Sequence, residues 1–268
     1  MTVVTVALVS LDAAGVRAHA SSGGRPDSVG GRCRTTSGRG RSPLGGSRSL
    51  AAAGTLVAVK EARTLAIVWV GLLAGVLAIG WLITHPLEST VEPWDDSISR
   101  SIADGRTPTG EFLAAWGSHV ADTIVGVVVA ALAGIVLWRM QKMRLPLVYF
   151  TVLVVGTLVL YLIVTALITR DRPPVTILDP GLVPDHSFPS GHVATSIVVY
   201  CALAVYLLRT VPGSRRWAWF LFLAPVIVAP SRLYEGAHHP TDVLASLVFA
   251  TLWVWAVAHV LLPDKVDA

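Results

Sequence analysis

Three short clusters of polar residues contain the side-chain types that bind a phosphate group and attack it. They read Arg-Asp-Arg-Pro at 170–173, Pro-Ser-Gly-His at 189–192, and Ser-Arg at 231–232 followed by His238 and Asp242. An arginine guanidinium binds two phosphate oxygens at once, and histidine acts as a nucleophile or transfers protons. Each cluster lies at the end of a long apolar run, so we expect one site where a membrane meets water.

The second cluster stands at the start of an expected helix. Ser190 is of a type that caps helix N-termini, and Gly191 allows the backbone to approach a ligand closely. The unpaired N–H groups and the positive partial charge of such a terminus favour phosphate. His192 lies on the first turn, where it can donate a proton to a departing oxygen. The alternative interpretation is an ordinary helix cap followed by a surface histidine.

The arginines of the first cluster have two interpretations. Pro173 and Pro174 end the preceding helix, and Arg172 is then placed to bind phosphate. A charge at the end of a membrane span also sets topology or extends to the lipid surface. We favour phosphate binding for Arg172, and both interpretations stay open for Arg170, which we include among the phosphate-binding candidates.

The third cluster combines a phosphate ligand with a nucleophile. Arg232 supplies a second guanidinium, and the spacing of His238 and Asp242 places them on one face of a helix. A carboxylate bound to one ring nitrogen fixes the tautomer and leaves the other nitrogen free to attack phosphorus. The neighbouring His239 competes for this role. Asp242 also fits as an ordinary charge at a helix N-terminus.

Together the clusters predict phosphoryl transfer through a phosphohistidine intermediate. Stabilising the charge on the phosphoryl oxygens is most of the catalytic work in such a reaction. The sequence shows no acidic cluster suited to Mg²⁺, so we expect neither a metal nor a cofactor. The arginines must then balance the charge of the phosphate.

The composition is that of an integral membrane protein. The chain has 268 residues, of which 53% are hydrophobic and 14% charged, and its mean hydropathy is +0.65. A net charge of +4 suggests nucleic acid at first sight. We reject that partner because the basic residues lie in a polar N-terminal arm and beside apolar runs, where they orient membrane spans. Cys33 and Cys201 are too far apart in unlike settings to suggest a disulfide framework.

Six apolar runs predict an all-α, polytopic bundle of six transmembrane helices within a phosphatase domain at 61–264. The fourth and fifth runs are short for a span, so we expect them to begin below the lipid surface or to include motif residues. The runs cover about 65–84, 121–138, 145–169, 193–208, 217–230 and 241–262.

The charges between the runs predict the orientation. By the positive-inside rule the side richer in Lys and Arg is cytoplasmic. The three clusters all fall on the opposite side, so we expect a multi-pass protein of the cell membrane whose site faces the extracytoplasmic side. The cytoplasmic charges are Lys60, Arg63, Arg139, Lys142, Arg144, Arg209, Arg215, Arg216 and Lys265.

Two further segments have no apolar run. Residues 1–60 are rich in Gly, Ser and Arg and predict a disordered cytoplasmic arm or an over-extended start codon. The alternative is a weak electrostatic contact of this arm with anionic lipid heads. The loop at 85–110 holds Trp94 and Asp95 and suggests a short amphipathic helix at the interface, with substrate contact as the alternative.

The clusters resemble the three signature motifs of the type 2 phosphatidic acid phosphatase family, which includes the vanadium haloperoxidases. The family motifs are Lys, six residues, Arg-Pro; then Pro-Ser-Gly-His; then Ser-Arg, five residues, His, three residues, Asp. The second and third motifs match fully, and the third selects His238 over His239. The first matches only at 172–173, because Thr165 occupies the position of the lysine. The resemblance covers about 65–262.

This resemblance implies a role for each residue. His238 is then the nucleophile, Asp242 orients it, and His192 protonates the leaving group and later activates water. Such family members work without metal. The phosphoryl oxygens are then held by Arg172, Arg232, Ser190 and the Gly191 amide, with Arg170 as a substitute for the missing lysine.

The leading hypothesis is therefore a membrane phosphatase that acts on phosphatidic acid, phosphatidylglycerol phosphate or a polyprenyl diphosphate. A transporter is disfavoured because the centres of the six runs lack ionisable residues. A catalytically silent lipid-binding relative is the other alternative, since Thr165 breaks the first motif, but the intact His238 and Asp242 disfavour it.

Overall fold

A computed structural model describes residues 44–263 of the chain, and all regular structure in this range is helical. The expected all-α class is therefore confirmed. Residues 1–43 of the expected arm lie outside the described residues. The remainder of that arm belongs to helix α2 (Leu44–Thr84), because Ala51, Ala52 and Ala53 are strong helix formers. The chain divides into two units between Arg63 and Thr64, and the description below concerns the second unit.

Six of the helical segments are long and apolar enough to cross a membrane, as expected. The fourth and fifth spans, which the sequence makes short, reach 20 residues each by taking in motif residues at their ends. His192 therefore lies in the fourth span and Arg232 in the fifth. The spans cover Ala58–Thr84, Thr123–Gln141, Leu145–Leu167, Gly191–Thr210, Arg215–Tyr234 and Pro240–Leu261.

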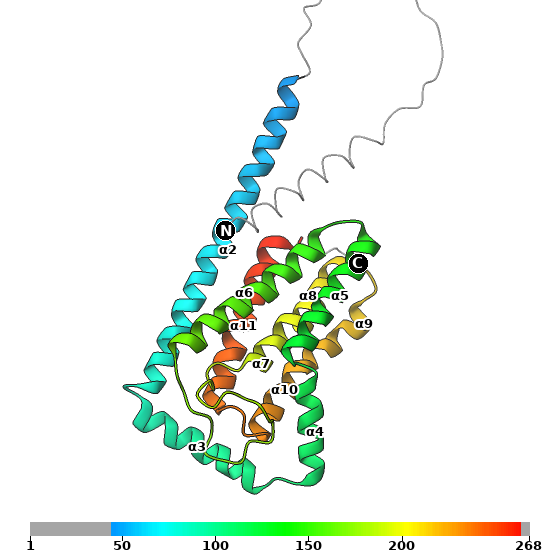
Figure 1. Cartoon of the computed structure of the whole chain (residues 1–268). Coiled ribbons are helices and arrows are strands. Elements are labelled where there is room, and N and C mark those ends of the chain that lie inside the picture. Colours follow the sequence, from blue (N-terminus) through cyan, green and yellow to red (C-terminus); the bar gives the residue numbers. More distant parts are fainter. Residues whose placement is uncertain (1–43, 264–268) are drawn as a thin grey trace, which may run out of the picture. The chain divides into compact units, whose positions relative to one another are not determined.

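The spans are built from helices that pack around the fourth span. Its first part, α7, contacts four of the other helices, and the fourth and sixth spans are the most buried of the six (Figure 1). The helices are α5 (Thr123–Gln141), α6 (Leu145–Leu167), α7 (Gly191–Ser196), α8 (Ala202–Thr210), α9 (Arg215–Ala218), α10 (Leu223–Tyr234) and α11 (Pro240–Leu261).

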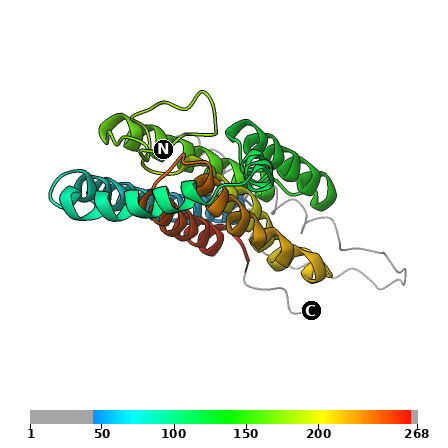
Figure 2. The ribbon, with the colours of Figure 1, turned by 90° about the horizontal axis from the view of Figure 1, so that it is seen from below.

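Two helices outside the spans complete one end of the bundle. They are α3 (Glu88–Asp104) and α4 (Pro108–His119), and Figures 1 and 2 show α3 lying across the end where residues 168–190 connect α6 to α7. The amphipathic helix expected at 85–110 is α3, with Trp94 exposed and Asp95 completely buried. One face of α3 therefore belongs to the interior.

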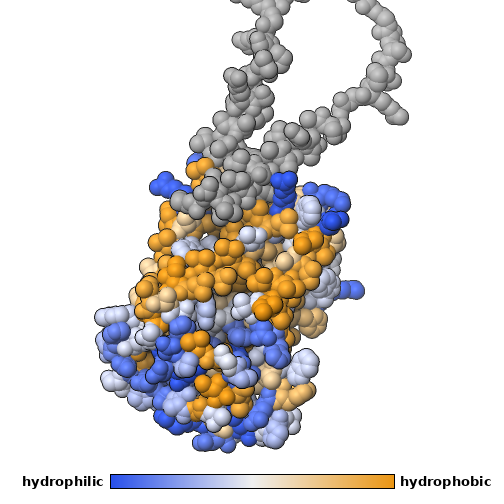
Figure 3. All heavy atoms as spheres, in the orientation of Figure 1, coloured by the Kyte–Doolittle hydropathy of each residue, from blue (hydrophilic) through white to orange (hydrophobic). Residues whose placement is uncertain are grey.

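The outer surface reflects a membrane environment. Apolar side chains cover the sides of the spans in Figure 3, whereas polar side chains gather at the end that carries α3 and α4. Exposed apolar residues of this kind need a lipid solvent. The chain is a multi-pass membrane protein, and the three motif clusters lie toward its polar end.

Helices α6 and α11 pack closely against each other at Gly156 and Trp253. A Cβ atom at Gly156 would lie 2.7 Å from Cζ2 of the buried Trp253, so Gly156→Ala forces a rigid indole to move. We expect this variant to lose about 1–3 kcal/mol of unfolding free energy. Gly71→Ala is the control, because a Cβ there meets no atom within 4 Å. Thermal unfolding in detergent compares the two, and equal midpoints would contradict the packing.

Candidate active site

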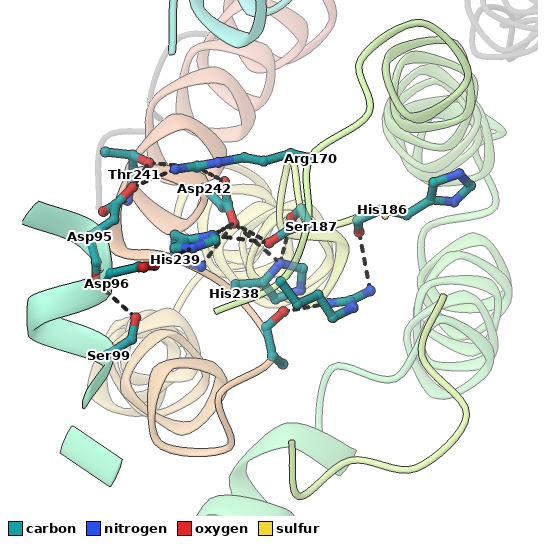
Figure 4. Close-up of polar contacts among 12 residues, drawn as sticks. Asp95, Asp96, Ser99, Arg170, His186, Ser187, His238, His239, Thr241 and Asp242 are labelled. Carbon is teal, nitrogen blue, oxygen red and sulfur yellow. Dashed lines mark hydrogen bonds and ion pairs between the residues drawn. The ribbon is translucent and has the colours of Figure 1, made fainter. Parts of the chain in front are cut away.

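The imidazole of His238 is fixed by a backbone carbonyl. Its Nδ1 lies 2.6 Å from the carbonyl oxygen of Ser187, in the connection between α6 and α7 (Figure 4). A carbonyl oxygen only accepts hydrogen bonds, so Nδ1 carries the proton and Nε2 keeps its lone pair. His238 is buried and lines a cavity. The ring is therefore in the tautomer that a nucleophile requires.

Asp242 acts on His238 less directly than the sequence suggests. Its Oδ2 lies 3.9 Å from Nδ1 of His238, which is an ion-pair distance rather than a hydrogen bond. The same oxygen accepts from the Ser187 hydroxyl at 2.6 Å and from the backbone N–H of His239 at 2.9 Å. The prediction of a direct hydrogen bond between Asp242 and His238 is therefore wrong, because Asp242 caps the first turn of its own helix. It reaches His238 through Ser187.

The electrostatic surroundings keep His238 neutral. Burial, followed by the positive charge of Arg232, lowers the pKa of His238 well below its ordinary value, and the charge of Asp242 only partly opposes them. A lowered pKa means that the proton leaves more readily. The imidazole is therefore uncharged at neutral pH and becomes protonated only in acid.

Arg232 and Ser190 present unpaired hydrogen-bond donors. Arg232 is completely buried, and its Nη1 lies 2.8 Å from carboxylate oxygens of both Asp179 and Glu235. Its Nε and Nη2 have no partner among the described residues, and neither does the buried Oγ of Ser190. Unpaired buried donors are costly, so they mark a place where a ligand supplies the acceptors. We refer to these three atoms as the unpaired donors.

Arg172 forms part of the cavity wall and is held by the backbone. Its Nε donates to the carbonyl of Val183 at 2.9 Å, its Nη2 to that of His186 at 3.1 Å, and its Nη1 to that of Ala237. One N–H on each terminal nitrogen remains for a ligand. The guanidinium is therefore oriented before any phosphate binds.

His192 is paired with a residue that the motifs do not include. Its Nε2 lies 2.9 Å from Oδ1 of Asp122, and Oδ2 of Asp122 lies 3.0 Å from Nδ1 of the exposed His119. Burial by itself raises the pKa of Asp122, but hydrogen bonds from His192 and His119 lower it below its ordinary value. Asp122 is therefore a carboxylate that accepts a hydrogen bond from Nε2–H of His192. Nδ1 of His192 remains available for another contact.

Arg170 does not serve as a phosphate ligand. Its Nη2 lies 2.7 Å from Asp95, and its Nη1 donates to Asp242 and, at 2.8 Å, to Thr241. The side chain is buried between these partners and is absent from the cavity wall. Both terminal nitrogens of Arg170 are directed at Asp95, Asp242 and Thr241 rather than at the cavity, so the structure does not support Arg170 as a replacement for the lysine. The phosphate-binding role given to it from sequence is not supported.

A cavity of about 310 Å³ brings four of the candidates together, whereas Arg232, Ser190 and Asp242 are buried and do not line it. It is lined by Arg172, Gly191, His192 and His238, and Tyr161 adds an aromatic wall. Its remaining walls are mostly apolar and come from α5, α6 and the fourth span. A second apolar space of about 270 Å³ between α5 and α6 shares Val127 and Val154 with the first. The polar chemistry therefore opens onto a groove suited to a hydrocarbon chain.

Comparison with known proteins finds a family match for the part of the chain that carries the three clusters. The model of the PAP2 superfamily matches residues 145–264, which hold all three clusters. This part of the chain belongs to the PAP2 superfamily. The family resemblance drawn from the motifs is thereby confirmed. In the described residues no group of three or more His, Cys, Asp or Glu side chains is placed to hold a metal ion.

Two curated proteins and one solved structure are similar to the chain. An undecaprenyl-diphosphatase of Sulfolobus acidocaldarius is 37% identical over 82 residues, covering 30% of this chain and 35% of that protein. Undecaprenyl-diphosphatase BcrC of Bacillus subtilis is 29% identical over 135 residues, covering 48% and 66%. The matches thus span less than two thirds of either relative.

The solved structure supports the fold. It is a transmembrane PAP2-type phosphatidylglycerolphosphate phosphatase from Bacillus subtilis, with 22% sequence identity and a TM-score of 0.62. The match covers 71% of this chain and 94% of that one. At this sequence identity, the similarity shows only that the two proteins share an arrangement of helices.

Several residues of the site were missed from sequence. Ser187 lies two residues before the second motif, which is a signal that could have suggested it. Asp122 lies directly before α5 and belongs to none of the three motifs. Asp179, in the connection between α6 and α7, and Glu235, at the end of α10, form ion pairs with Arg232. No local sequence pattern predicts these two pairs.

Ser190→Ala tests the unpaired donors. Without phosphate, we expect the melting temperature to stay unchanged or rise, because the buried hydroxyl has no partner to lose. With inorganic phosphate, we expect affinity to fall about tenfold, as for a hydrogen bond to a charged group. Thermal unfolding across a phosphate titration measures both.

Ser214→Ala provides the matched control. Its buried hydroxyl donates to the Leu207 carbonyl at 2.9 Å, far along the chain from the clusters. This variant should melt lower and bind phosphate normally. A Ser190→Ala protein that melts lower with unchanged phosphate affinity would show that Ser190 only supports the fold.

Proposed function

We propose that the protein is a membrane phosphatase that hydrolyses a lipid phosphate or diphosphate through a phosphohistidine on His238. The observation that carries the proposal is the buried Arg232, whose Nε and Nη2 have no partner among the described residues and whose charge acts on the uncharged His238. A buried cation with free N–H groups needs an anion, and a neutral imidazole beside that anion is a nucleophile.

The first step joins phosphorus to the histidine. The lone pair on Nε2 of His238 attacks the phosphorus, and the bond from phosphorus to the leaving oxygen breaks. His192 donates a proton to that oxygen, which leaves as an alcohol or a phosphate. Arg172, Arg232, Ser190 and the Gly191 amide stabilise the phosphoryl oxygens throughout.

The second step releases the phosphate. His192, now neutral and still bound to Asp122 through Nε2–H, removes a proton from water with Nδ1, and the resulting hydroxide attacks phosphorus. The bond from phosphorus to Nε2 breaks, and His238 becomes neutral again. Proton uptake and release balance over the cycle, so the reaction needs no other reactant. Independence from metal remains part of this proposal.

Among lipid phosphates, a polyprenyl diphosphate is the preferred substrate. Both curated relatives carry the name undecaprenyl-diphosphatase. The apolar groove between α5 and α6 continues from the cavity, which suits a long hydrocarbon chain. Phosphatidylglycerol phosphate is the second candidate, since the similar solved structure is a phosphatase of that lipid.

The substrate is tested with purified protein and excess chelator. Phosphate release from a polyprenyl diphosphate, phosphatidic acid and phosphatidylglycerol phosphate is compared, and we expect the diphosphate to give the highest kcat/KM. With labelled substrate, a base-stable and acid-labile phosphoprotein should form in the wild type and disappear in His238→Ala.

His259→Gln is the control, because His259 is exposed and stacks on Trp255 near the far end of α11. It should form the phosphoprotein at the wild-type rate. Normal turnover by His238→Ala would refute the nucleophile. Loss of activity with chelator would refute metal independence.

The orientation is a further part of the proposal and has its own test. A single cysteine is introduced by Asp185→Cys or by Met143→Cys in a Cys33→Ser background. Asp185 is exposed in the connection between α6 and α7, and Met143 is exposed in the connection between α5 and α6. An impermeant thiol reagent added to intact cells should label position 185 alone, and lysis should expose position 143. The reverse pattern would place the site on the cytoplasmic face.

A further inference from the structure

A buried ion network joins α3 to the first turn of α11. Asp95 is completely buried, and its Oδ2 accepts from Nη2 of Arg170 at 2.7 Å. Arg170 also donates to Oδ1 of Asp242 and, at 2.8 Å, to the hydroxyl of Thr241. Figure 4 shows Arg170 lying between these residues. One guanidinium thus holds carboxylates from two helices together.

Asp95 also caps α11 from outside that helix. Its Oδ1 accepts from the backbone N–H of Thr241 at 3.1 Å, and its Oδ2 accepts from the Thr241 hydroxyl. The beginning of a helix carries unpaired N–H groups and a positive partial charge, so a carboxylate is stabilising there. Asp96, the next residue on α3, lies 3.3 Å from Nε2 of His239. The docking of α3 therefore orders residues 239–242.

This network continues to the reacting histidine. The oxygen of Asp242 that Arg170 leaves free accepts from the Ser187 hydroxyl, and the Ser187 carbonyl holds Nδ1 of His238. A shift of Asp242 would move Ser187 and thereby the direction of the His238 lone pair. Four successive contacts join Asp95 to the ring, and Asp95 lies outside the part of the chain that matches the family.

We propose that Asp95 is a positioning residue for phosphoryl transfer, which acts through Arg170 and Asp242 to fix the orientation of His238. The inference rests on the proposed phosphatase function. It gives α3 a role in catalysis and assigns Arg170 to the support of the nucleophile. It also explains why Arg170 is buried among carboxylates at a site that handles an anion.

The test compares Asp95→Asn with Glu92→Gln, which is the same kind of change at an exposed position of α3. For Asp95→Asn we expect kcat to fall by about ten- to a hundredfold, as for a lost buried hydrogen bond between charged groups. KM should change by less than about threefold, since no ligand contact is removed. Glu92→Gln should behave as the wild type.

The pH profile gives a readout that a change in folding alone would not move. The charged groups that act on His238 are Arg232 of α10, Asp242 of α11 and Arg172 of the connecting loop. Asp95→Asn leaves Arg170 with less negative charge beside it, and this excess positive charge disfavours protonated His238. The acid limb of kcat/KM should therefore move to lower pH with the same substrate.

Asp95→Asn/Arg170→Gln removes both partners of the ion pair and leaves Asp242 held by the Ser187 hydroxyl and the backbone N–H of His239, so it decides the matter where the single variant does not fold. A double variant that loses no more activity than the worse single variant supports action through Arg170. Wild-type kcat in the double variant would overturn the proposal. So would an unchanged kcat and acid limb in a folded Asp95→Asn protein.

The outcomes also separate this inference from the proposed function. A wild-type protein that forms no phosphohistidine refutes the function itself. An active wild type together with a fully active Asp95→Asn refutes only the positioning role.

Discussion

Pairing of charges removed from water is the constraint on which the site depends. Arg170 is bound by Asp95 and Asp242, and Arg232 is bound by Asp179 and Glu235. A buried ion that loses its partner destabilises a protein by several kcal/mol, so the helices and loops that bring these partners must assemble together. The exception is the pair of unpaired nitrogens on Arg232. A phosphoryl group would supply the acceptors that these two nitrogens lack.

The connection between α6 and α7 shapes the site through its backbone more than through its side chains. Its carbonyls hold Nδ1 of His238 and two nitrogens of Arg172. A carbonyl accepts and never donates, so these contacts fix the tautomer of the imidazole and the orientation of the guanidinium. Such a loop can be irregular and still partly buried because its polar groups find partners in the site. The functional groups and the loop therefore satisfy one another.

The sequence predicted what local patterns can encode. Apolar runs gave the six spans, and motif spacing correctly brought His192, His238 and Arg172 to one cavity. Prediction from sequence failed for ion pairs between residues that are far apart in the chain. Nothing near Arg170 indicates that it pairs with Asp95, because the two are brought together only by the docking of α3. Such pairing is a property of the tertiary fold, and a motif cannot contain it.

The departure at Thr165 bears on how the site gains its positive charge. The Thr165 hydroxyl donates to the Tyr161 carbonyl at 3.0 Å, so it turns back onto its own helix. One turn earlier, the Tyr161 ring lines the cavity beside Gly191. A phenol is neutral, whereas a lysine would add a full charge, so Arg172 and Arg232 must provide the cationic stabilisation by themselves. With fewer charges, stabilisation of the phosphoryl group depends more on the direction of each N–H. That dependence is a physical reason for anchoring both guanidinium groups before substrate binds, one by carbonyls and the other by carboxylates.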